Sequence, residues 1–438
     1  MPLIVWVTPV SKKSAIAQFS QIIVDELVRR NQNVVVVSSD MGAIGESLFD
    51  DCVHYGDSET LRALSDSGAK FIYNVGNNYG YHGGVIEICE KFPGVGVFHD
   101  VYYYDLFYGW IRSLSLDAHD EFLADIYGAS VPLDLRLVED VLAHRAEHFP
   151  MLEWVAPKFN SIITHSRFAA HRMKRLVLGP VSFVPLAYKA PIQTAASDVD
   201  EKSCVSDKMI VSTFGDANSN KRIESVIRGI ASSDILKRRI QYNLVGSISD
   251  AYKSKLIDFA TDLGVDLIVM GRVSPDDYAR HMNATAVVCC LRYPPTESAS
   301  ATLVESLLSE KLTLVTDIGC YSDVPDDLVV KVSWDDEVRG LAHGMRLALE
   351  NPEFADLTGR NARKWAEQTY SVDTYVDGVE AHLGAQSARR ENLVIWQRTR
   401  DLLKVICVGD RDEETLSLLV ENIRNFEILG ASSSVGVA

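Results

Sequence analysis

The residues whose types and spacing best suit ligand binding or catalysis lie between positions 292 and 305, in the run Arg-Tyr-Pro-Pro-Thr-Glu-Ser-Ala-Ser-Ala-Thr-Leu-Val-Glu. Its two glutamates, Glu297 and Glu305, stand eight positions apart, which is a little over two helical turns, so both can address one face. Their carboxylates can accept hydrogen bonds from the hydroxyl groups of one polyhydroxylated ligand. Two solvated glutamates on an amphipathic helix are the alternative that this stretch alone leaves open.

The same run predicts a loop that leads into a helix. Pro294 and Pro295 favour the loop, while Ser298, Ser300 and Thr302 are residue types that cap a helix N-terminus. Such a terminus offers free N–H groups and the positive end of the helix dipole, which suits a phosphate. We therefore expect a ligand that carries both hydroxyl and phosphate groups.

A second candidate phosphate site lies at positions 214–222. Gly215 ends a predicted strand, where a glycine lets the backbone approach a ligand closely. Lys221 is predicted to open the next helix, where a diphosphate would rest. The segment lacks the second glycine and the Ser/Thr of a nucleotide-triphosphate P-loop. A solvated basic first turn is the alternative.

Apolar runs suited to buried parallel strands alternate with helical patterns along most of the chain. The predicted strands are residues 3–8, 33–38, 71–75, 95–98, 161–164, 181–184, 208–214, 240–245, 267–270, 286–291 and 312–316. This alternation implies right-handed crossovers and parallel sheets covered on both faces. We expect an α/β protein with two Rossmann-like, doubly wound domains facing a central cleft, the usual place for a ligand.

Shifts in composition set the expected domain limits. A polar segment without periodicity indicates a linker before residue 207. We expect an N-terminal Rossmann-like domain at 1–190, a linker at 191–206, a C-terminal Rossmann-like domain at 207–370, a helix at 371–385 that returns to the N-terminal domain, and an appended tail at 386–438. Within the tail, residues 392–396 and 403–408 are strand-like, and 413–425 are predicted to be helical.

The composition limits the class of protein. A chain of 438 residues with 47% hydrophobic and 24% charged residues is typical of a globular protein with two or three domains. Its net charge of −17 argues against nucleic acid as the main partner, because phosphate backbones bind to concentrated basic surfaces. No apolar run reaches the roughly 18 residues that span a bilayer, and a signal-peptide pattern is absent at the N-terminus. The scattered cysteines favour a reduced compartment, so we expect a cytoplasmic protein.

Residues from about 210 to 370 resemble the donor-binding domain of the retaining glycosyltransferases of family 4 (glycosyl transferases group 1), which have the two-domain GT-B fold. The matching features occur in order: Gly215 with Lys221, Val245-Gly246, Gly271–Val273, Glu297 with Glu305, and Asp317 with Gly319. The resemblance implies that Lys221 binds the donor diphosphate, Glu305 the nucleotide ribose and Glu297 the hydroxyls of the donor sugar. It further implies that the backbone near Val273 holds the base and that N–H groups around Ser298 and Ser300 meet the sugar and phosphates.

The chain also departs from the family pattern. Asp216 stands where the family often has arginine, and we expect Arg222 or Arg292 to supply that charge. Thr296 and Ser300 replace glycines of the glutamate element, and Ala15 and Ala17 replace those of the first loop.

In the N-terminal half, Val97-Phe-His99-Asp100 ends a strand as in relatives whose histidine lines the cleft near the transferring sugar, which implies this role for His99. A capped strand end is the alternative. The aromatic run 102–110 is compatible with sugar stacking, with anchoring to a membrane surface, or with a packed core helix.

We therefore expect a cytoplasmic, retaining hexosyltransferase that moves a sugar from a nucleotide-diphosphate donor to a glycan or lipid-linked acceptor. Synthesis of a bacterial-type surface polysaccharide or glycoconjugate is the expected setting, with His99 and Glu297 as catalytic residues. Because no His/Cys/Asp cluster has metal-ligand spacing, we expect neither a metal nor a cofactor. Peripheral contact with the inner face of the membrane and homo-oligomerisation are compatible with this function. A GT-B-fold sugar-nucleotide epimerase and a non-catalytic glycan-binding or scaffold protein with a degenerate donor site are the alternatives.

Overall fold

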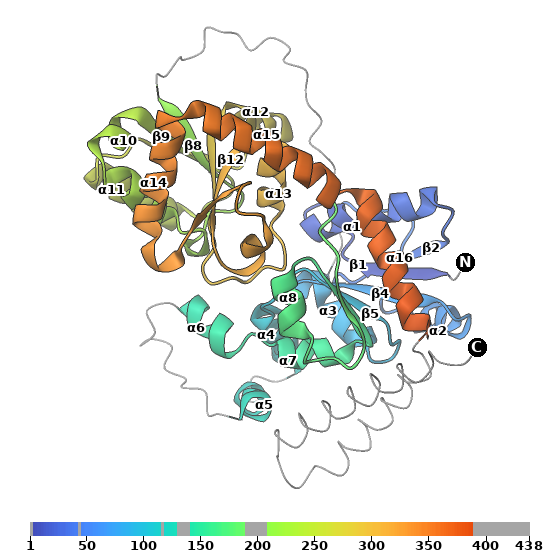
Figure 1. Ribbon diagram of the computed structural model, residues 1–438. Helices are drawn as coiled ribbons and strands as arrows, with labels where there is room; N and C mark the ends of the chain where they lie inside the picture. The colour runs from blue at the N-terminus through green and yellow to red at the C-terminus, as the bar shows by residue number, and fades with distance from the viewer. Residues whose placement is uncertain (1–2, 43–44, 115–117, 129–140, 189–207, 389–438) are drawn as a thin grey trace, which may run out of the picture.

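The computed structural model describes residues 3–42, 45–114, 118–128, 141–188 and 208–388. They form two parallel β-sheets in separate domains, and helices alternate with the strands in each (Figure 1). Each sheet has an apolar cluster on both of its faces. This arrangement confirms the predicted α/β class with two Rossmann-like domains.

The N-terminal sheet has seven strands in the order β3-β2-β1-β4-β5-β6-β7. Its central strands are almost wholly apolar because both faces are covered: Val5 and Val7 pack into one cluster, while Ile4 and Trp6 pack into the other. The strands are β1 (Ile4–Thr8), β2 (Val34–Ser38), β3 (Val53–His54), β4 (Lys70–Val75), β5 (Val95–Phe98), β6 (Ser161–Thr164) and β7 (Val181–Phe183).

Helices connect these strands, with the longest insertion between β5 and β6. The aromatic run predicted at 102–110 lies at the start of this insertion, where Tyr103 and Phe107 are fully buried in the domain core. The helices are α1 (Ala15–Arg29), α2 (Ser58–Asp66), α3 (Tyr79–Ile88), α4 (Tyr104–Leu114), α5 (Ala118–Tyr127), α6 (Val141–His148), α7 (Leu152–Val155) and α8 (Arg167–Met173). Among the described residues, no helix has the length and apolar character that crossing a membrane requires.

The C-terminal sheet has six strands in the order β10-β9-β8-β11-β12-β13, all parallel. The order reverses between β8 and β11, so the loops after these two strands diverge and leave room at their carboxyl ends. The strands are β8 (Met209–Phe214), β9 (Ile240–Val245), β10 (Leu267–Gly271), β11 (Val287–Cys290), β12 (Leu312–Thr316) and β13 (Val330–Val332).

The helix that follows the Glu297 loop begins where its capping residue predicts. The Ser300 side chain accepts a hydrogen bond from Leu303 N at 3.4 Å, so α13 begins at Ala301. The helices of this domain are α9 (Ile223–Ala231), α10 (Asp234–Arg239), α11 (Asp250–Asp262), α12 (Pro275–Ala284), α13 (Ala301–Leu308), α14 (Glu337–Glu350) and α15 (Pro352–Thr369). The predicted linker 191–206 and the predicted tail elements beyond residue 388 lie outside the described residues.

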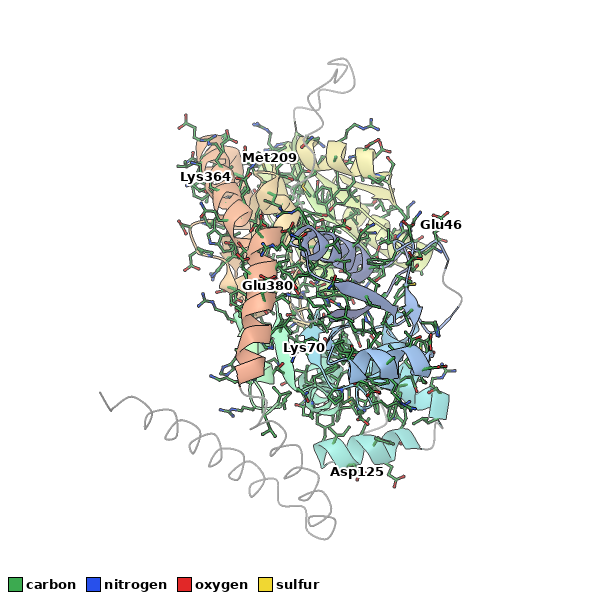
Figure 2. All side chains as sticks on the ribbon, turned by 90° about the vertical axis from the view of Figure 1, so that its right-hand side faces the viewer. Glu46, Lys70, Asp125, Met209, Lys364 and Glu380 are labelled. Carbon is green, nitrogen blue, oxygen red and sulfur yellow. The ribbon has the colours of Figure 1, made fainter. Side chains whose placement is uncertain are left out.

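The last described helix, α16 (Val372–Ala388), leaves the C-terminal domain and packs on the N-terminal one. Figure 2 shows α15 and α16, marked by Lys364 and Glu380, running along one side of the molecule. Tyr375, Val376 and Val379 are fully buried in the cluster that also holds Ile23 and Leu27 of α1. The N-terminal core is therefore completed by residues that come after the C-terminal domain.

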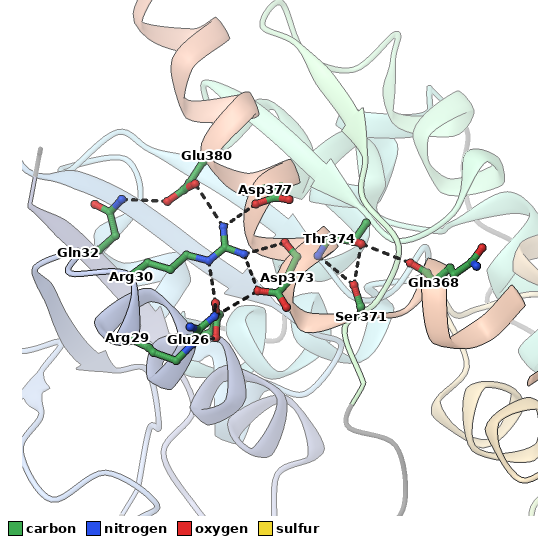
Figure 3. A network of polar contacts seen from close by, with 10 residues as sticks. All are labelled: Glu26, Arg29, Arg30, Gln32, Gln368, Ser371, Asp373, Thr374, Asp377 and Glu380. Carbon is green, nitrogen blue, oxygen red and sulfur yellow. Dashed lines mark hydrogen bonds and ion pairs between the residues drawn. The ribbon is translucent and has the colours of Figure 1, made fainter. Parts of the chain in front are cut away.

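An ion cluster borders this contact (Figure 3). Arg30, which follows α1, pairs with Glu26 of its own helix and with Asp373 and Asp377 of α16 at 2.5–2.9 Å. The two aspartate side chains are each 69% exposed, so water screens them and the pairs contribute little. Burial of the apolar face of α16 is the larger stabilising term.

We expect the two kinds of contact to differ on mutation. Tyr375→Ala should lower the free energy of unfolding by about 3–5 kcal/mol, because it empties a large buried volume. Arg30→Ala should lower it by no more than about 1 kcal/mol, and 1 M salt should remove the difference. Tyr375→Phe is the control, because the part of the chain that the structure describes offers the buried Tyr375 hydroxyl no hydrogen-bond partner. Urea denaturation measures all three, and a larger loss for Arg30→Ala would contradict this ranking.

Candidate active site

Two loops from different domains meet through their main chains. One follows β5 of the N-terminal domain, and the other leads into α13 of the C-terminal domain. Asp100 and Glu297 form an antiparallel β-bridge between them. The hydrogen bonds across this junction run from Val101 N to Thr296 O (2.9 Å), from Ser298 N to His99 O (3.0 Å) and from His165 N to the Ser298 hydroxyl (2.9 Å). The junction brings the predicted residues His99, Glu297 and Ser298 into one site.

The two carboxylate oxygens of Glu297 differ in their hydrogen bonding. Its Oε1 accepts two hydrogen bonds from Arg292, at 2.9 Å from Nε and 2.6 Å from Nη2. Its Oε2 is buried and has no hydrogen-bond partner among the described residues. A buried carboxylate oxygen without a donor is costly, and it marks a place where a ligand hydroxyl would fit.

The predicted phosphate site lies between the ends of β8 and β11 and the N-terminus of α13. Lys221 is only 6% exposed, and its ammonium donates to Phe214 O beside Gly215. Gly215 has a φ of +80°, and a Cβ there would lie 2.7 Å from Lys221 Nζ, so a larger residue would displace the lysine. The cavity that Lys221 shares with Arg292 and Ser300 measures about 10 Å³, room for roughly one water molecule.

The local structure around Lys221 differs from the prediction that it opens a helix. Lys221 instead ends a 3₁₀ turn, Ser219–Lys221, and α9 begins at Ile223. Between them Arg222 adopts a left-handed conformation with a φ of +57°, which breaks the helical path. The Arg222 guanidinium pairs with the buried Glu337 at the start of α14, at 2.9 Å. Of the two arginines considered for the missing charge, Arg292 lines the cavity and Arg222 is held by Glu337.

Burial makes Lys221 an unusual lysine. Desolvation lowers its pKa from the usual 10.5 to about 8, and the nearby Arg292 acts in the same direction. The two cations share one small space, where they can bind an anion that carries more than one negative charge. The positive end of α13 points into the same cavity, since Ser300 and Thr302 line it.

Glu305 lies on α13, and each of its carboxylate oxygens accepts one hydrogen bond from a tyrosine. Tyr188 donates to Oε1 and Tyr278 donates to Oε2. Tyr278 belongs to α12, and its ring packs edge-on against Phe214 with the centroids 5.1 Å apart. Val273, predicted to lie near the base of a nucleotide, packs against the same apolar cluster as Tyr278.

Each polar atom of His99 lies within hydrogen-bonding distance of another described residue. Its Nε2 lies 3.1 Å from the side-chain amide of Asn74, and its Nδ1 lies 3.2 Å from His165 Nε2. Its carbonyl accepts from Ser298 N across the domain junction. Burial lowers the pKa of His99 well below its usual value, and the neighbouring His165 and His82 add to this, so the ring is neutral at pH 7. A ring held in this way suits positioning better than proton transfer.

Asp100 is a site residue that the sequence analysis passed over. Its carboxyl accepts from Asn77 N at 2.9 Å, and burial raises its pKa to about 7. Glu297 across the β-bridge opposes its ionisation as well. Tyr188, Tyr278 and His165 were likewise missed as contacts of the site. Their roles depend on partners more than 25 positions away, for which the sequence holds no local signal.

Comparisons with known proteins agree with the C-terminal motifs. Residues 198–365 match the family described as "Glycosyl transferases group 1". This match confirms the predicted resemblance of this part of the chain to the glycosyl transferases group 1. Among curated proteins, no match to the chain is found.

Solved structures share the whole fold at low sequence identity. Sucrose-phosphate synthase from Thermosynechococcus elongatus is 12% identical, with 89% of this chain and 100% of that chain covered and a TM-score of 0.61. Anabaena HepE in complex with UDP and glucose is 14% identical, with 88% and 100% covered and a TM-score of 0.56. A trehalose-phosphate synthase from Burkholderia vietnamiensis is 9% identical, with 89% and 100% covered and a TM-score of 0.56. These likenesses assign the GT-B fold.

The buried lysine leads to a prediction about stability and pH. The unfolded chain holds the Lys221 proton up to a pKa near 10.5, whereas the folded protein releases it near 8. Burying the charged form therefore opposes folding below pH 8, by about 3 kcal/mol, and this cost disappears as the pH rises to 10.5. Lys221→Met should raise the free energy of unfolding at pH 7 and lose that advantage by pH 10.5.

Urea denaturation at both pH values tests this, with the exposed Lys253→Met as the matched control. If Lys221→Met is less stable than the wild type at pH 7, the expectation is wrong. The charged Lys221 would then have stabilising contacts beyond its hydrogen bond to Phe214 O.

Proposed function

We propose that this chain, whose residues 198–365 match the group 1 glycosyl transferases, is a retaining glycosyltransferase that uses a nucleotide-diphosphate sugar. The observation that carries the proposal is the junction between the loops of His99 and Glu297. It places the unpartnered oxygen of Glu297 at the meeting of both domains. A sugar bound there would lie between a donor-side carboxylate and the N-terminal domain.

Charge in the cleft supports a nucleotide-diphosphate donor. Lys221, Arg292 and the N-terminus of α13 converge on one cavity, and together they stabilise the charge of a departing diphosphate. Glu305 offers a carboxylate for the ribose hydroxyls of the nucleotide. The related fold of HepE was solved with UDP and glucose, a ligand pair of this class.

We propose a reaction without a metal ion, because these cationic groups can neutralise the diphosphate themselves. The anomeric carbon passes through an oxocarbenium-like state, which Glu297 and its surroundings orient. The leaving phosphate accepts the proton of the attacking acceptor hydroxyl. The acceptor is a glycan or a lipid-linked glycan of a surface polysaccharide or glycoconjugate, and the site of action is the cytoplasm or the inner face of the membrane.

The function is tested by incubating the protein with UDP-, GDP- and ADP-sugars, with and without a panel of glycan and lipid-linked acceptors. We expect nucleotide release that depends on an acceptor, a product with the anomeric configuration of the donor, and the same rate in EDTA. Free epimerised sugar formed without an acceptor would identify an epimerase. Failure to bind any of the nucleotides would identify a non-catalytic protein.

The two glutamates should respond differently when each is changed to glutamine. Glu305→Gln should weaken binding of the bare nucleotide diphosphate, because a uniform binding contact is lost. Glu297→Gln should leave that affinity nearly unchanged and lower kcat by about 10²–10³-fold, because its contact matters most in the transition state. Calorimetry and initial rates distinguish the two effects.

The control is Glu353→Gln, which changes an exposed glutamate in the first turn of α15 and should alter neither property. If Glu297→Gln and Glu305→Gln both behave like this control, neither glutamate contributes to nucleotide binding or turnover, and the proposed roles are wrong.

A further inference from the structure

The Glu305 carboxylate is held by two tyrosines that come from different parts of the fold. Tyr278 lies on α12 within the C-terminal domain, and it donates to Oε2. Tyr188 follows β7 of the N-terminal domain, and it donates to Oε1. The carboxylate therefore receives one hydroxyl on each oxygen, and one of these hydroxyls is brought in from across the domain boundary.

This arrangement leaves the carboxylate able to bind a ligand. An ionised carboxylate has about four lone-pair positions, two on each oxygen. Each tyrosine uses one position on its own oxygen, so one acceptor position remains on each. Two free acceptors on one carboxylate match the two adjacent hydroxyls of a ribose. Without the tyrosines, the partly buried carboxylate would have neither a fixed rotamer nor a described hydrogen-bond partner.

Both tyrosines are themselves fixed in place. The Tyr278 ring packs against Phe214, the last residue of β8. The Tyr188 N–H donates to Tyr370 O at 2.9 Å, at the point where the chain leaves α15 for α16. Burial raises the pKa of both hydroxyls, and the negative charge of Glu305 raises it further, so both stay protonated and continue to donate.

We propose that Tyr188 and Tyr278 are positioning residues that hold the Glu305 carboxylate for the ribose of a nucleotide diphosphate. The inference rests on the proposed function, because it requires Glu305 to bind the donor nucleotide. Tyr188 also ties ribose recognition to the domain connection, since its main chain contacts Tyr370. The specificity that the pair confers is for ribose over 2′-deoxyribose, because the deoxy sugar offers Glu305 only one hydroxyl.

The test is calorimetry of Tyr188→Phe and Tyr278→Phe with UDP, GDP or ADP, using whichever binds the wild type most tightly, and with its 2′-deoxy analogue. We expect each variant to bind the ribonucleotide about three- to ten-fold more weakly. Binding of the deoxynucleotide should change much less, so the preference for ribose should shrink. Glu305→Gln should shrink it further. Tyr127→Phe is the matched control, because it removes a 2.8 Å tyrosine–glutamate bond to Glu153 in the N-terminal domain.

The contrary outcomes are distinct. Ribonucleotide binding that is unchanged or tighter in both variants would overturn the inference, and tighter binding would mean that the hydroxyls compete with the ribose. An equal loss for both nucleotides would also overturn it, because a general structural defect does not discriminate between sugars. Melting temperatures identify such a defect independently. If the wild type binds none of the nucleotides, the proposed function fails and the inference fails with it. If the wild type prefers the ribonucleotide and both variants keep that preference, the inference alone is contradicted.

Discussion

The main-chain contact between residues 99–101 and 296–298 is the constraint on which the rest of the site depends. Each domain supplies one side of the space between them: His165 and Phe183 line a cavity there from the N-terminal domain, and Ser300 and Leu303 line it from the C-terminal domain. Hydrogen bonds between backbones set the separation of the two halves without depending on side-chain length. Ser298 adds a side-chain bond to His165 N, which ties the end of β6 to the same loop. The distance between the histidine of one domain and the carboxylate of the other follows from these few contacts.

The charged side chains of the site have hydrogen-bond partners within the protein. Lys221 donates to a carbonyl, Glu297 accepts from Arg292, and Glu305 accepts from two tyrosines. A buried charge without such partners would strongly oppose folding. A ligand that binds these groups therefore replaces hydrogen bonds that already exist within the protein. The measured binding free energy is then the difference between two hydrogen-bonded states. Glu297 Oε2, which has no hydrogen-bond partner among the described residues, is an exception, and it lies where the sugar is proposed to bind.

The sequence predicts the fold well because buried parallel strands leave a strong local signal. The predicted strands 95–98 and 161–164 are buried on both faces, and they match β5 and β6 residue for residue. The Ser300 cap is equally local. The partners of the site residues are not local: Tyr188 lies 117 positions from Glu305, and Arg222 lies 115 positions from Glu337. The prediction that Lys221 opens a helix was wrong, because no neighbouring residue type predicts the left-handed conformation of Arg222.

The path of the chain has a consequence for how such a protein can be divided. Tyr188 and Tyr370 are joined by a main-chain hydrogen bond, and between them the chain builds the whole C-terminal domain before α16 rejoins the N-terminal core. In topological terms, the C-terminal domain is an insert, and the described residues on either side of it, Tyr188 and Tyr370, are in contact. Such an insert can be exchanged for another without breaking the host core, because among the described residues the chain leaves the N-terminal domain after Tyr188 and returns to it after Tyr370. The host half is discontinuous in sequence, so truncation before residue 372 would remove part of its hydrophobic core while leaving the inserted domain intact.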